Sequence, residues 1–536
     1  MTASRWKRES GRYRASMEVD FPPSAGFVCR AWGNMGARDP MPCVLGISAA
    51  AGEIASDDVI VIGDPDAERY LLAGAVTAFR SQSFFRVLRR GGRFTAIEVE
   101  QPDIRNGETP EEILVLEGND WRELLFRYAD TAAERMNVPA FDTSKNMTGY
   151  CTWYYYYKEV TGQDLLDNLN ALAANRKPFA AEYVQIDDGY QKRHGDWLEQ
   201  SEGWSFTLKE AADRIKAKGM KPGIWLMPFV ASTASRLFRE HPDWFVRDGN
   251  GEAIRRRGWT PPPEQDWCCL DGTHPEVQKY IVHVFKSMRE MGYEYFKLDG
   301  LGYGMTDGLR YDGGATAVSA FRELLKTIRA TVPDSLLMAC SEPFMPCLGF
   351  FDNARVSCDT SRSFSSEENP NRNFPQLGAN ILNAAHQTLA NFWKYDRWFR
   401  CDPDTLMARQ DNAFYTPGEA KISVLTGILT GISITSDRLD TIAPDRLHLL
   451  GLAQKYRMRN VRPFRQIPGQ WPFFFEGTIA GKRSVAVFND SAGKLPCRFE
   501  ELGLPEKCLE ILTGKSVRSE LTVPPHDAAL LTEEGE

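Results

Sequence analysis

Two short segments of the sequence end in a carboxylate and suggest acid–base chemistry. The first, Tyr295-Phe-Lys-Leu-Asp-Gly, is typical of a β-strand that ends at Asp299, and the second, Arg355-Val-Ser-Cys-Asp-Thr, of a strand that ends at Asp359. Alternation of side chains along a strand places Lys297 on the face of Asp299, and Arg355 on the face of Asp359. Two carboxylates brought by separate strand ends into one pocket are the groups that cleavage of a glycosidic bond requires. Whether they share a pocket depends on the fold.

Two further predicted strands carry polar or aromatic side chains on one face and apolar ones on the other. Asp187 ends the strand at 182–187 and is followed by Asp188, while Trp225 lies within the strand at 222–227. Two adjacent carboxylates suit binding better than reaction, because together they can hold neighbouring hydroxyls of one sugar ring. The alternative is a set of ordinary buried ion pairs, but several charges near one axis are costly to desolvate. Asp404 and Asp437 are interpreted as helix caps or loop residues.

A nucleophilic carboxylate must be ionised, and a neighbouring cation favours that form. Lys297, two residues before Asp299, suits this role and could also bind a sugar hydroxyl. An acid must begin protonated, which requires less polar or more negative surroundings. The sequence around Asp359 leaves its pKa open.

Strands and helices alternate between residues 148 and 457. The predicted strands cover 148–155, 182–187, 222–227, 294–299, 335–340, 354–359, 398–402 and 432–436. Amphipathic helices are predicted at 163–176, 207–218, 275–291, 315–330, 376–391 and 416–429. Eight strands with interleaved helices indicate an α/β fold of the (β/α)8 TIM barrel type, whose active site lies at the carboxyl ends of the strands. The alternative is an open doubly wound sheet, which the absence of a Gly-rich loop after the first strand disfavours.

The segments on either side of this region lack helical periodicity. Short alternating runs broken by Gly and Pro predict an antiparallel β-sandwich-like domain at 1–140. A helix near 121–136, at the end of this range, leads into the next region. We expect the catalytic barrel to cover 141–460. Alternating segments such as 484–489 and 528–532 predict a small C-terminal β-sandwich at 461–536.

Composition excludes several classes of protein. Among 536 residues, 43% are hydrophobic and 25% charged, as in ordinary globular proteins, and the net charge of −8 argues against nucleic-acid or anionic-membrane partners. Neither a signal peptide nor a membrane span is recognised, and the 11 scattered cysteines suit reduced thiols, so we expect a cytoplasmic protein. No His/Cys/carboxylate cluster has ligand spacing, so neither a metal nor a cofactor is expected. The oligomeric state stays open.

Seven motifs occur in the order found in glycoside hydrolase family 36, the α-galactosidase and raffinose-synthase family. They are Gly149-Tyr-Cys-Thr-Trp-Tyr, Gln185-Ile-Asp-Asp-Gly-Tyr, Pro222-Gly-Ile-Trp-Leu-Met-Pro-Phe, His241-Pro-Asp-Trp-Phe-Val, Tyr295-Phe-Lys-Leu-Asp, Arg355-Val-Ser-Cys-Asp-Thr and Tyr395-Asp-Arg-Trp-Phe-Arg-Cys-Asp-Pro-Asp. The sequence resembles the shorter bacterial α-galactosidases of this family most closely, over about residues 150–440.

The resemblance implies a retaining exo-α-galactosidase without a cofactor. It assigns Asp299 as nucleophile and Asp359 as acid/base. The residues that it implies around the terminal sugar are Asp187, Asp188, Trp225, Lys297, Arg355, Trp153 and Cys340, of which Trp153 is equally well interpreted as core. The expected substrate is an α-galactoside oligosaccharide or glycoconjugate.

The sequence departs from the larger family members in two places. They carry a Gly-rich loop after a cysteine at the fifth strand, whereas this chain reads Cys340-Ser-Glu-Pro-Phe-Met-Pro-Cys. That difference leaves N-acetylgalactosamine or a modified galactose open as the sugar. Their N-terminal domain is also longer, so their tetrameric assembly is not carried over. Sugar transfer, as in raffinose synthases, and a non-catalytic sugar-binding protein are the other hypotheses, although a binding protein would not need both Asp299 and Asp359.

Overall fold

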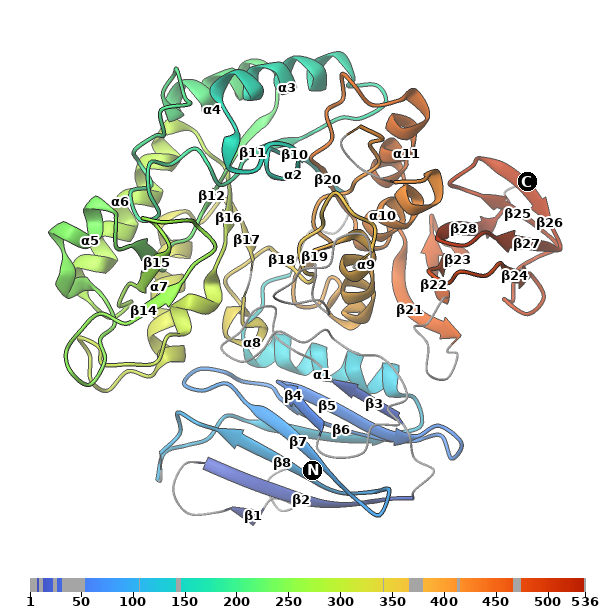
Figure 1. Ribbon diagram of the computed structural model, residues 1–536. Helices are drawn as coiled ribbons and strands as arrows, with labels where there is room; N and C mark the ends of the chain where they lie inside the picture. The colour runs from blue at the N-terminus through green and yellow to red at the C-terminus, as the bar shows by residue number, and fades with distance from the viewer. Residues whose placement is uncertain are drawn as a thin grey trace. The chain divides into compact units, whose positions relative to one another are not determined.

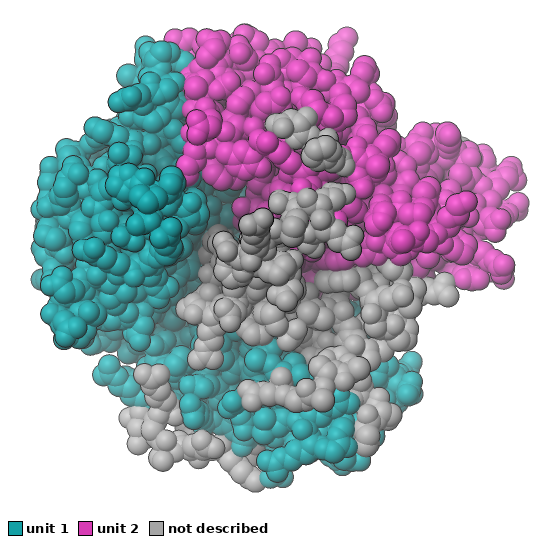
Figure 2. Space-filling view, in the orientation of Figure 1, with its two compact units in different colours: residues 1–140, 188–212, 223–354 teal, residues 141–187, 213–222, 355–536 magenta. Residues whose placement is uncertain are grey.

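The computed structural model describes residues 7–8, 13–22, 27–30, 54–105, 107–140, 146–340, 342–365, 379–411, 415–465 and 474–534. Two compact units alternate along the chain and are coloured separately in Figure 2. The first contains residues 1–140, 188–212 and 223–354, and the second contains 141–187, 213–222 and 355–536. The domain boundaries expected near residues 140 and 460 remain predictions. Within the described ranges, no helix is both long and apolar enough to cross a membrane.

Eight strands form a parallel sheet, as predicted (Figure 1). They are β10 (Met147–Cys151), β11 (Tyr183–Ile186), β12 (Lys221–Leu226), β16 (Tyr295–Leu298), β17 (Leu336–Ala339), β18 (Asn353–Arg355), β19 (Arg400–Asp402) and β20 (Ile432–Thr435). Their order is β19-β18-β17-β16-β12-β11-β10-β20. Just beyond β19, Leu406 forms a parallel bridge with Thr435 of β20. The sheet therefore has the near-closed arrangement of a TIM barrel.

Helices follow the strands in the alternation expected for this fold. They are α2 (Trp153–Tyr156) and α3 (Gly162–Ala174) after β10, α4 (Leu208–Ala217) after β11, α5 (Arg236–Glu240) and α6 (Pro275–Met291) after β12, α7 (Ala317–Thr331) after β16, α8 (Phe344–Cys347) after β17, α9 (Ile381–Ala390) after β18, α10 (Pro417–Thr430) after β19 and α11 (Pro444–Lys455) after β20. The six predicted helices correspond to α3, α4, α6, α7, α9 and α10. Short 3-10 turns lie at Tyr157–Glu159, Pro242–Trp244, Leu301–Met305 and Phe392–Lys394.

The two faces of β16 follow the predicted alternation. Phe296 packs against Phe285 of α6, with ring centroids 5.3 Å apart. On the other face, Tyr295 lies beside Gly223 of β12, where an added Cβ would come within 2.5 Å of the Tyr295 ring. The absence of a side chain at residue 223 thus makes room for the large side chains on this face.

Two antiparallel sheets form the N-terminal part of the first unit. One has the order β1-β2-β8-β7-β4 and the other β3-β5-β6-β9. The strands are β1 (Lys7–Arg8), β2 (Tyr13–Phe21), β3 (Phe27–Arg30), β4 (Ile54–Asp57), β5 (Val59–Asp64), β6 (Arg69–Ala75), β7 (Phe84–Arg90), β8 (Arg93–Gln101) and β9 (Ile113–Gly118), followed by helix α1 (Trp121–Arg135). Side chains from both sheets, among them Ile97 and Leu71, form one buried cluster, and the predicted N-terminal antiparallel β-structure is confirmed.

The C-terminal part of the second unit is also antiparallel. Its sheets have the orders β21-β22-β23-β28-β25-β26 and β24-β27. The strands are β21 (Arg459–Arg465), β22 (Phe474–Ile479), β23 (Lys482–Asn489), β24 (Leu495–Arg498), β25 (Lys507–Glu510), β26 (Lys515–Arg518), β27 (Glu520–Val523) and β28 (Asp527–Glu533). Val485 of the larger sheet and Val523 of the smaller one share a buried cluster, as a small sandwich requires.

A three-stranded antiparallel sheet between β12 and α6 was not predicted. It consists of β13 (Val230–Ser232), β15 (Asp266–Cys269) and β14 (Arg255–Arg257), in the order β13-β15-β14. The turn between β14 and β15 carries Trp259, which is 43% exposed. This insertion therefore brings an exposed aromatic side chain into the part of the first unit that follows β12.

Two strand predictions extend too far. The strand expected at 354–359 ends at Arg355, so Asp359 lies in a loop and the alternation argument does not apply to it. Loop contacts satisfy the backbone instead, since the Cys358 N–H donates to the Gln387 side chain over 2.5 Å. The strand expected at 148–155 likewise ends at Cys151, and Trp153 begins α2.

Candidate active site

Asp299 directly follows β16 and is partly exposed. Its Oδ2 accepts a hydrogen bond of 3.0 Å from the indole N–H of Trp225, and its Oδ1 accepts one of 2.6 Å from the N–H of Gly300. Gly300 adopts φ +60°, in the left-handed region, and an added Cβ would collide with Met227. Two N–H donors thus fix the carboxylate and stabilise its charged form, and a glycine makes the turn possible.

Two other predicted site residues lie close to Asp299 in the first unit. Lys297 is on β16, opposite Trp225 of β12 in the sheet register, and its side chain is buried. Cys340 directly follows β17 and is fully buried. Its N–H donates to the carbonyl of Leu298 over 2.8 Å, and its carbonyl accepts from the N–H of Leu301. The backbone of Cys340 therefore supports the turn that carries Asp299.

Asp188 is buried and interacts with three side chains of the first unit. Gln191 donates to its Oδ1 over 2.6 Å, and Nε2 of His194 lies 3.8 Å from the same oxygen. The indole N–H of Trp259 donates to Oδ2 over 3.4 Å. His194 is in turn held by Glu264, whose Oε1 lies 2.9 Å from its Nδ1. These partners fix the orientation of a carboxylate predicted to bind a sugar hydroxyl.

Aromatic rings surround His194 in the first unit. The His194 ring lies 4.9 Å from Trp267, 5.8 Å from Trp225 and 6.4 Å from Trp259. Trp267 and Trp259 meet edge to face at 4.5 Å. Trp259 and His194 were absent from the predicted site. Trp259 lies between Gly258 and Thr260, outside every predicted strand and helix, so no sequence signal pointed to it.

Asp187 is also buried, but its partners belong to the second unit. Its Oδ2 accepts from the side-chain amide of Gln185 and lies 3.4 Å from the Cys151 Sγ. Its N–H donates to the hydroxyl of Thr152 over 3.0 Å. In these contacts the adjacent residues Asp187 and Asp188 thus have different partners, those of Asp187 in the second unit and those of Asp188 in the first.

Arg355 and Asp359 form an ion pair of 2.7 Å within the second unit. The Arg355 side chain is 4% exposed, whereas that of Asp359 is 48% exposed. Asp359 is thus open to solvent on one side and held by a buried cation on the other. Because Asp299 belongs to the first unit, a shared substrate for the two carboxylates remains a prediction.

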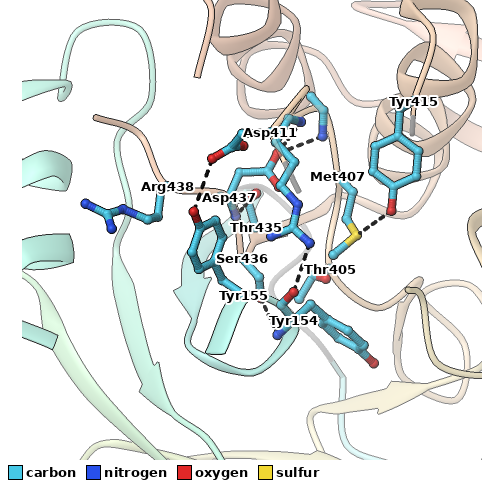
Figure 3. A network of polar contacts seen from close by, with 12 residues as sticks. Tyr154, Tyr155, Thr405, Met407, Asp411, Tyr415, Thr435, Ser436, Asp437 and Arg438 are labelled. Atoms are coloured by element: carbon cyan, nitrogen blue, oxygen red, sulfur yellow. Dashed lines mark hydrogen bonds and ion pairs between the residues drawn. The ribbon is translucent and has the colours of Figure 1, made fainter. Parts of the chain in front are cut away.

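Trp153, the remaining predicted site residue, begins α2. It is partly exposed, and its ring meets Tyr157 edge to face at 5.3 Å. Tyr154 and Tyr155, the next two residues, enter a polar network with residues near the end of β20 (Figure 3). This network shows how the second unit anchors the short aromatic helix.

Arg409 and Asp437 are both fully buried and lie close to each other in this network; Asp437 is labelled in Figure 3. Arg409 donates to the Tyr154 carbonyl over 3.0 Å, and its Nε lies 3.8 Å from Asp437. Asp437 accepts from the N–H groups of Ala408 and Arg409 over 2.7 and 2.9 Å. The hydroxyl of Tyr155 donates to Asp411 over 3.1 Å. Asp437, expected to be a cap or loop residue, is thus a buried anchor.

The protonation of Asp437 should make stability depend on pH. Burial raises the pKa of Asp437 to about 6, although Arg409 and the two N–H donors act in the opposite direction. The folded state then holds this proton more tightly than the unfolded state, so the stability it contributes is present below about pH 4 and is lost as pH rises through about 6. Asn carries no titratable proton, so we expect the stability of Asp437→Asn not to fall in this way as pH rises.

Thermal unfolding of the wild type and of Asp437→Asn at pH 4.5 and 7.5 tests this expectation. The wild type should lose about 2 kcal/mol relative to the variant between the two pH values, because the unfolded state is already mostly deprotonated at pH 4.5. If the difference in unfolding free energy between the wild type and Asp437→Asn is the same at both pH values, the raised pKa of Asp437 is contradicted.

Comparison with known proteins finds similarity to a glycosidase family over part of the chain. Residues 108–309 match the Melibiase family model. The matched range contains β10, β11, β12 and β16, and with them Asp187, Asp188 and Asp299. The resemblance to glycoside hydrolase family 36 inferred from the motifs is therefore confirmed.

Solved structures that resemble the chain confirm the fold. An α-galactosidase from Thermus thermophilus, in complex with p-nitrophenyl α-D-galactopyranoside, matches 90% of this chain and 95% of its own, with a TM-score of 0.68 and 24% identity. The family 36 α-galactosidase AgaA from Geobacillus stearothermophilus matches 98% of this chain and 78% of its own, with a TM-score of 0.65 and 13% identity.

A curated relative matches a smaller share of the chain than these solved structures do. The bifunctional α-galactosidase/sucrose kinase AgaSK of Mediterraneibacter gnavus is 29% identical over 202 residues, which are 35% of this chain. The alignment spans 20% of the length of AgaSK.

Proposed function

We propose that this protein is a retaining exo-α-galactosidase that releases terminal α-linked galactose from oligosaccharides or glycoconjugates. The observation that carries the proposal is Asp299 at the end of β16, held by Trp225 and Gly300 within the Melibiase match. Similarity to α-galactosidases, one of them bound to a p-nitrophenyl α-galactoside, supports this choice of sugar.

The proposed reaction has two displacements at the anomeric carbon. In the first, the Asp299 carboxylate forms a bond to this carbon while the bond to the leaving oxygen breaks and Asp359 protonates that oxygen. In the second, the Asp359 carboxylate takes a proton from water, the water oxygen bonds to the anomeric carbon, and Asp299 is released. The two inversions together retain configuration, and they require carboxyl groups about 5–5.5 Å apart.

The remaining residues bind the terminal sugar in this proposal. Asp187 and Asp188 accept hydrogen bonds from hydroxyls, including the axial 4-hydroxyl of galactose. Trp225 orients Asp299, and Lys297 offers a cation on the same strand. Arg355, Trp153 and Cys340 are the other residues that we propose to contact the sugar.

A screen of p-nitrophenyl α-glycosides, with NMR of the first-formed anomer, tests the proposal. We expect α-galactoside to be hydrolysed fastest and α-galactose to appear first. Faster cleavage of α-N-acetylgalactosaminide or α-glucoside would contradict the sugar, β-galactose as first product would contradict retention, and predominant transfer to an added sugar would favour a transferase.

Trp259 should affect substrate binding more than chemistry, because its exposed ring lies beside Asp188. Loss of an aromatic contact with a sugar ring is worth about 0.5–1.5 kcal/mol. We therefore expect Trp259→Ala to raise KM about 3- to 10-fold with little change in kcat. Trp259→Phe, which keeps a ring but loses the N–H, should raise KM less. An unchanged KM in the Ala variant would place the ring outside the substrate site.

A further inference from the structure

Asp404 lies in the loop after β19 and has a constrained backbone. Its side chain is 3% exposed, and its φ of +74° is in the left-handed region, which few residues other than glycine adopt. Its N–H donates to Asp402 Oδ1 over 3.2 Å. Sparsely populated backbone conformations persist where the surrounding structure enforces them, and they are frequent at functional sites.

Four donors converge on one oxygen of Asp404. Arg355 Nη1 lies 3.2 Å from Oδ2. The N–H and the hydroxyl of Thr360 donate to the same oxygen over 2.8 and 3.2 Å, and the hydroxyl of Tyr154 also donates to it. Burial and the nearby Asp359 and Asp404 carboxylates raise the pKa of Tyr154 well above its usual value, so its hydroxyl remains a donor.

Three of these four donors come from two residues that are tied to Asp359, namely Thr360 and Arg355. Thr360 is the next residue in the chain, so its contact with Asp404 fixes the backbone beside Asp359. Arg355 uses its other terminal nitrogen, Nη2, to pair with Asp359 over 2.7 Å. Asp404 therefore holds both the backbone beside Asp359 and the cationic partner of Asp359.

We propose that Asp404 is a positioning residue for proton transfer, which orients Asp359 through Arg355 and Thr360. The inference rests on the proposed function, in which Asp359 is the acid/base. Asp404 also supplies a negative charge that offsets the charge of Arg355. Without it, Arg355 would favour the carboxylate form of Asp359 more strongly, and that form cannot protonate a leaving group.

Asp404→Asn tests the proposal, because Asn keeps the size of the side chain and tolerates the left-handed backbone. Activity is compared on p-nitrophenyl α-galactoside, whose leaving group needs little protonation, and on an α-galactosyl disaccharide, whose leaving group needs a proton. We expect kcat/KM to fall at least about tenfold more on the disaccharide. The alkaline limb of its pH profile should shift down by about one unit.

The other titratable groups near Asp359 should not shift the alkaline limb of the pH profile. Burial and Asp359 raise the pKa of Cys358 to about 12, and Tyr154 also titrates far above neutrality. Asp437→Asn is the structural control, since Asp437 is equally buried in the second unit but pairs with Arg409. Any loss in this control should be equal on both substrates.

Tyr154→Phe provides a second, milder variant that removes one donor to Asp404. Like Asp404→Asn, it should lose more activity on the disaccharide than on p-nitrophenyl α-galactoside, but by a smaller factor. If Asp404→Asn does not fold, Tyr154→Phe tests the proposal in its place. Equal loss on both substrates with an unchanged pH profile would overturn the role of Asp404. If Asp359→Asn itself shows no dependence on the leaving group, or the wild type cleaves neither galactoside, the proposed function fails as well.

Discussion

Asp299→Ala should reduce hydrolysis of p-nitrophenyl α-galactoside by at least about 10⁴-fold. The carboxylate supplies the atom that bonds to the anomeric carbon, and no described contact offers a replacement at that position. Two N–H donors, from Trp225 and Gly300, already hold it in one orientation. Because Asp299 is partly exposed, its removal should cost little stability, so the loss of activity should appear in a folded protein.

Steady-state rates and thermal unfolding of three variants check this expectation. Asp299→Asn keeps the shape of the side chain and should be nearly as inactive as the Ala variant. Trp225→Phe removes one donor to the carboxylate and should cost about 10- to 100-fold. Asp334→Ala, at an exposed carboxylate before β17, should retain full activity. Undiminished turnover by Asp299→Ala would exclude Asp299 as the nucleophile.

The predicted barrel is recovered from sequence because its strands and helices have different periods. All eight strands and six of the helices between them were expected, and β16 follows the alternation residue by residue. The alternation of side chains along β16 predicts their direction because apolar residues such as Phe296 pack against helices, while Tyr295 and Lys297 occupy the other face of the sheet.

The same reasoning fails where backbone hydrogen bonds leave the sheet. Asp359 was placed on a strand face, but β18 ends at Arg355 and the next residues bond to side chains such as Gln387. Alternation then says nothing about the direction of Asp359. Its ion pair with Arg355, four residues earlier, is a property of the loop that sequence spacing did not indicate.

Residues on insertions and loops were missed for a related reason. Trp259 lies between two short strands of an insertion that follow neither period, and Asp404 lies in an irregular loop after β19. Their importance comes from contacts with Asp188 and Arg355, residues far away in the sequence. Such contacts exist only once the chain has folded, so residue type alone allowed an interpretation of Asp404 as no more than a helix cap or a loop residue.

Asp359→Ala should produce a loss that depends on the leaving group. On an α-galactosyl disaccharide, kcat/KM should fall by about 10²- to 10⁴-fold, the contribution typical of a general acid. On p-nitrophenyl α-galactoside it should fall far less, because the phenolate departs without a proton. The second step still needs a base, so the glycosyl-enzyme on Asp299 should accumulate, and kcat and KM for this substrate should fall together.

Azide separates this role from a general loss of structure. As a small anion that needs no base, it should attack the accumulated glycosyl-enzyme of Asp359→Ala, restore turnover of the p-nitrophenyl substrate and yield a galactosyl azide. Asp445→Ala, an exposed carboxylate in the same unit, should behave as the wild type and gain nothing from azide. Equal losses on both substrates, without rescue, would remove Asp359 from proton transfer. Because its side chain is half exposed beside a buried Arg355, the truncation leaves space for the anion where the carboxylate had been.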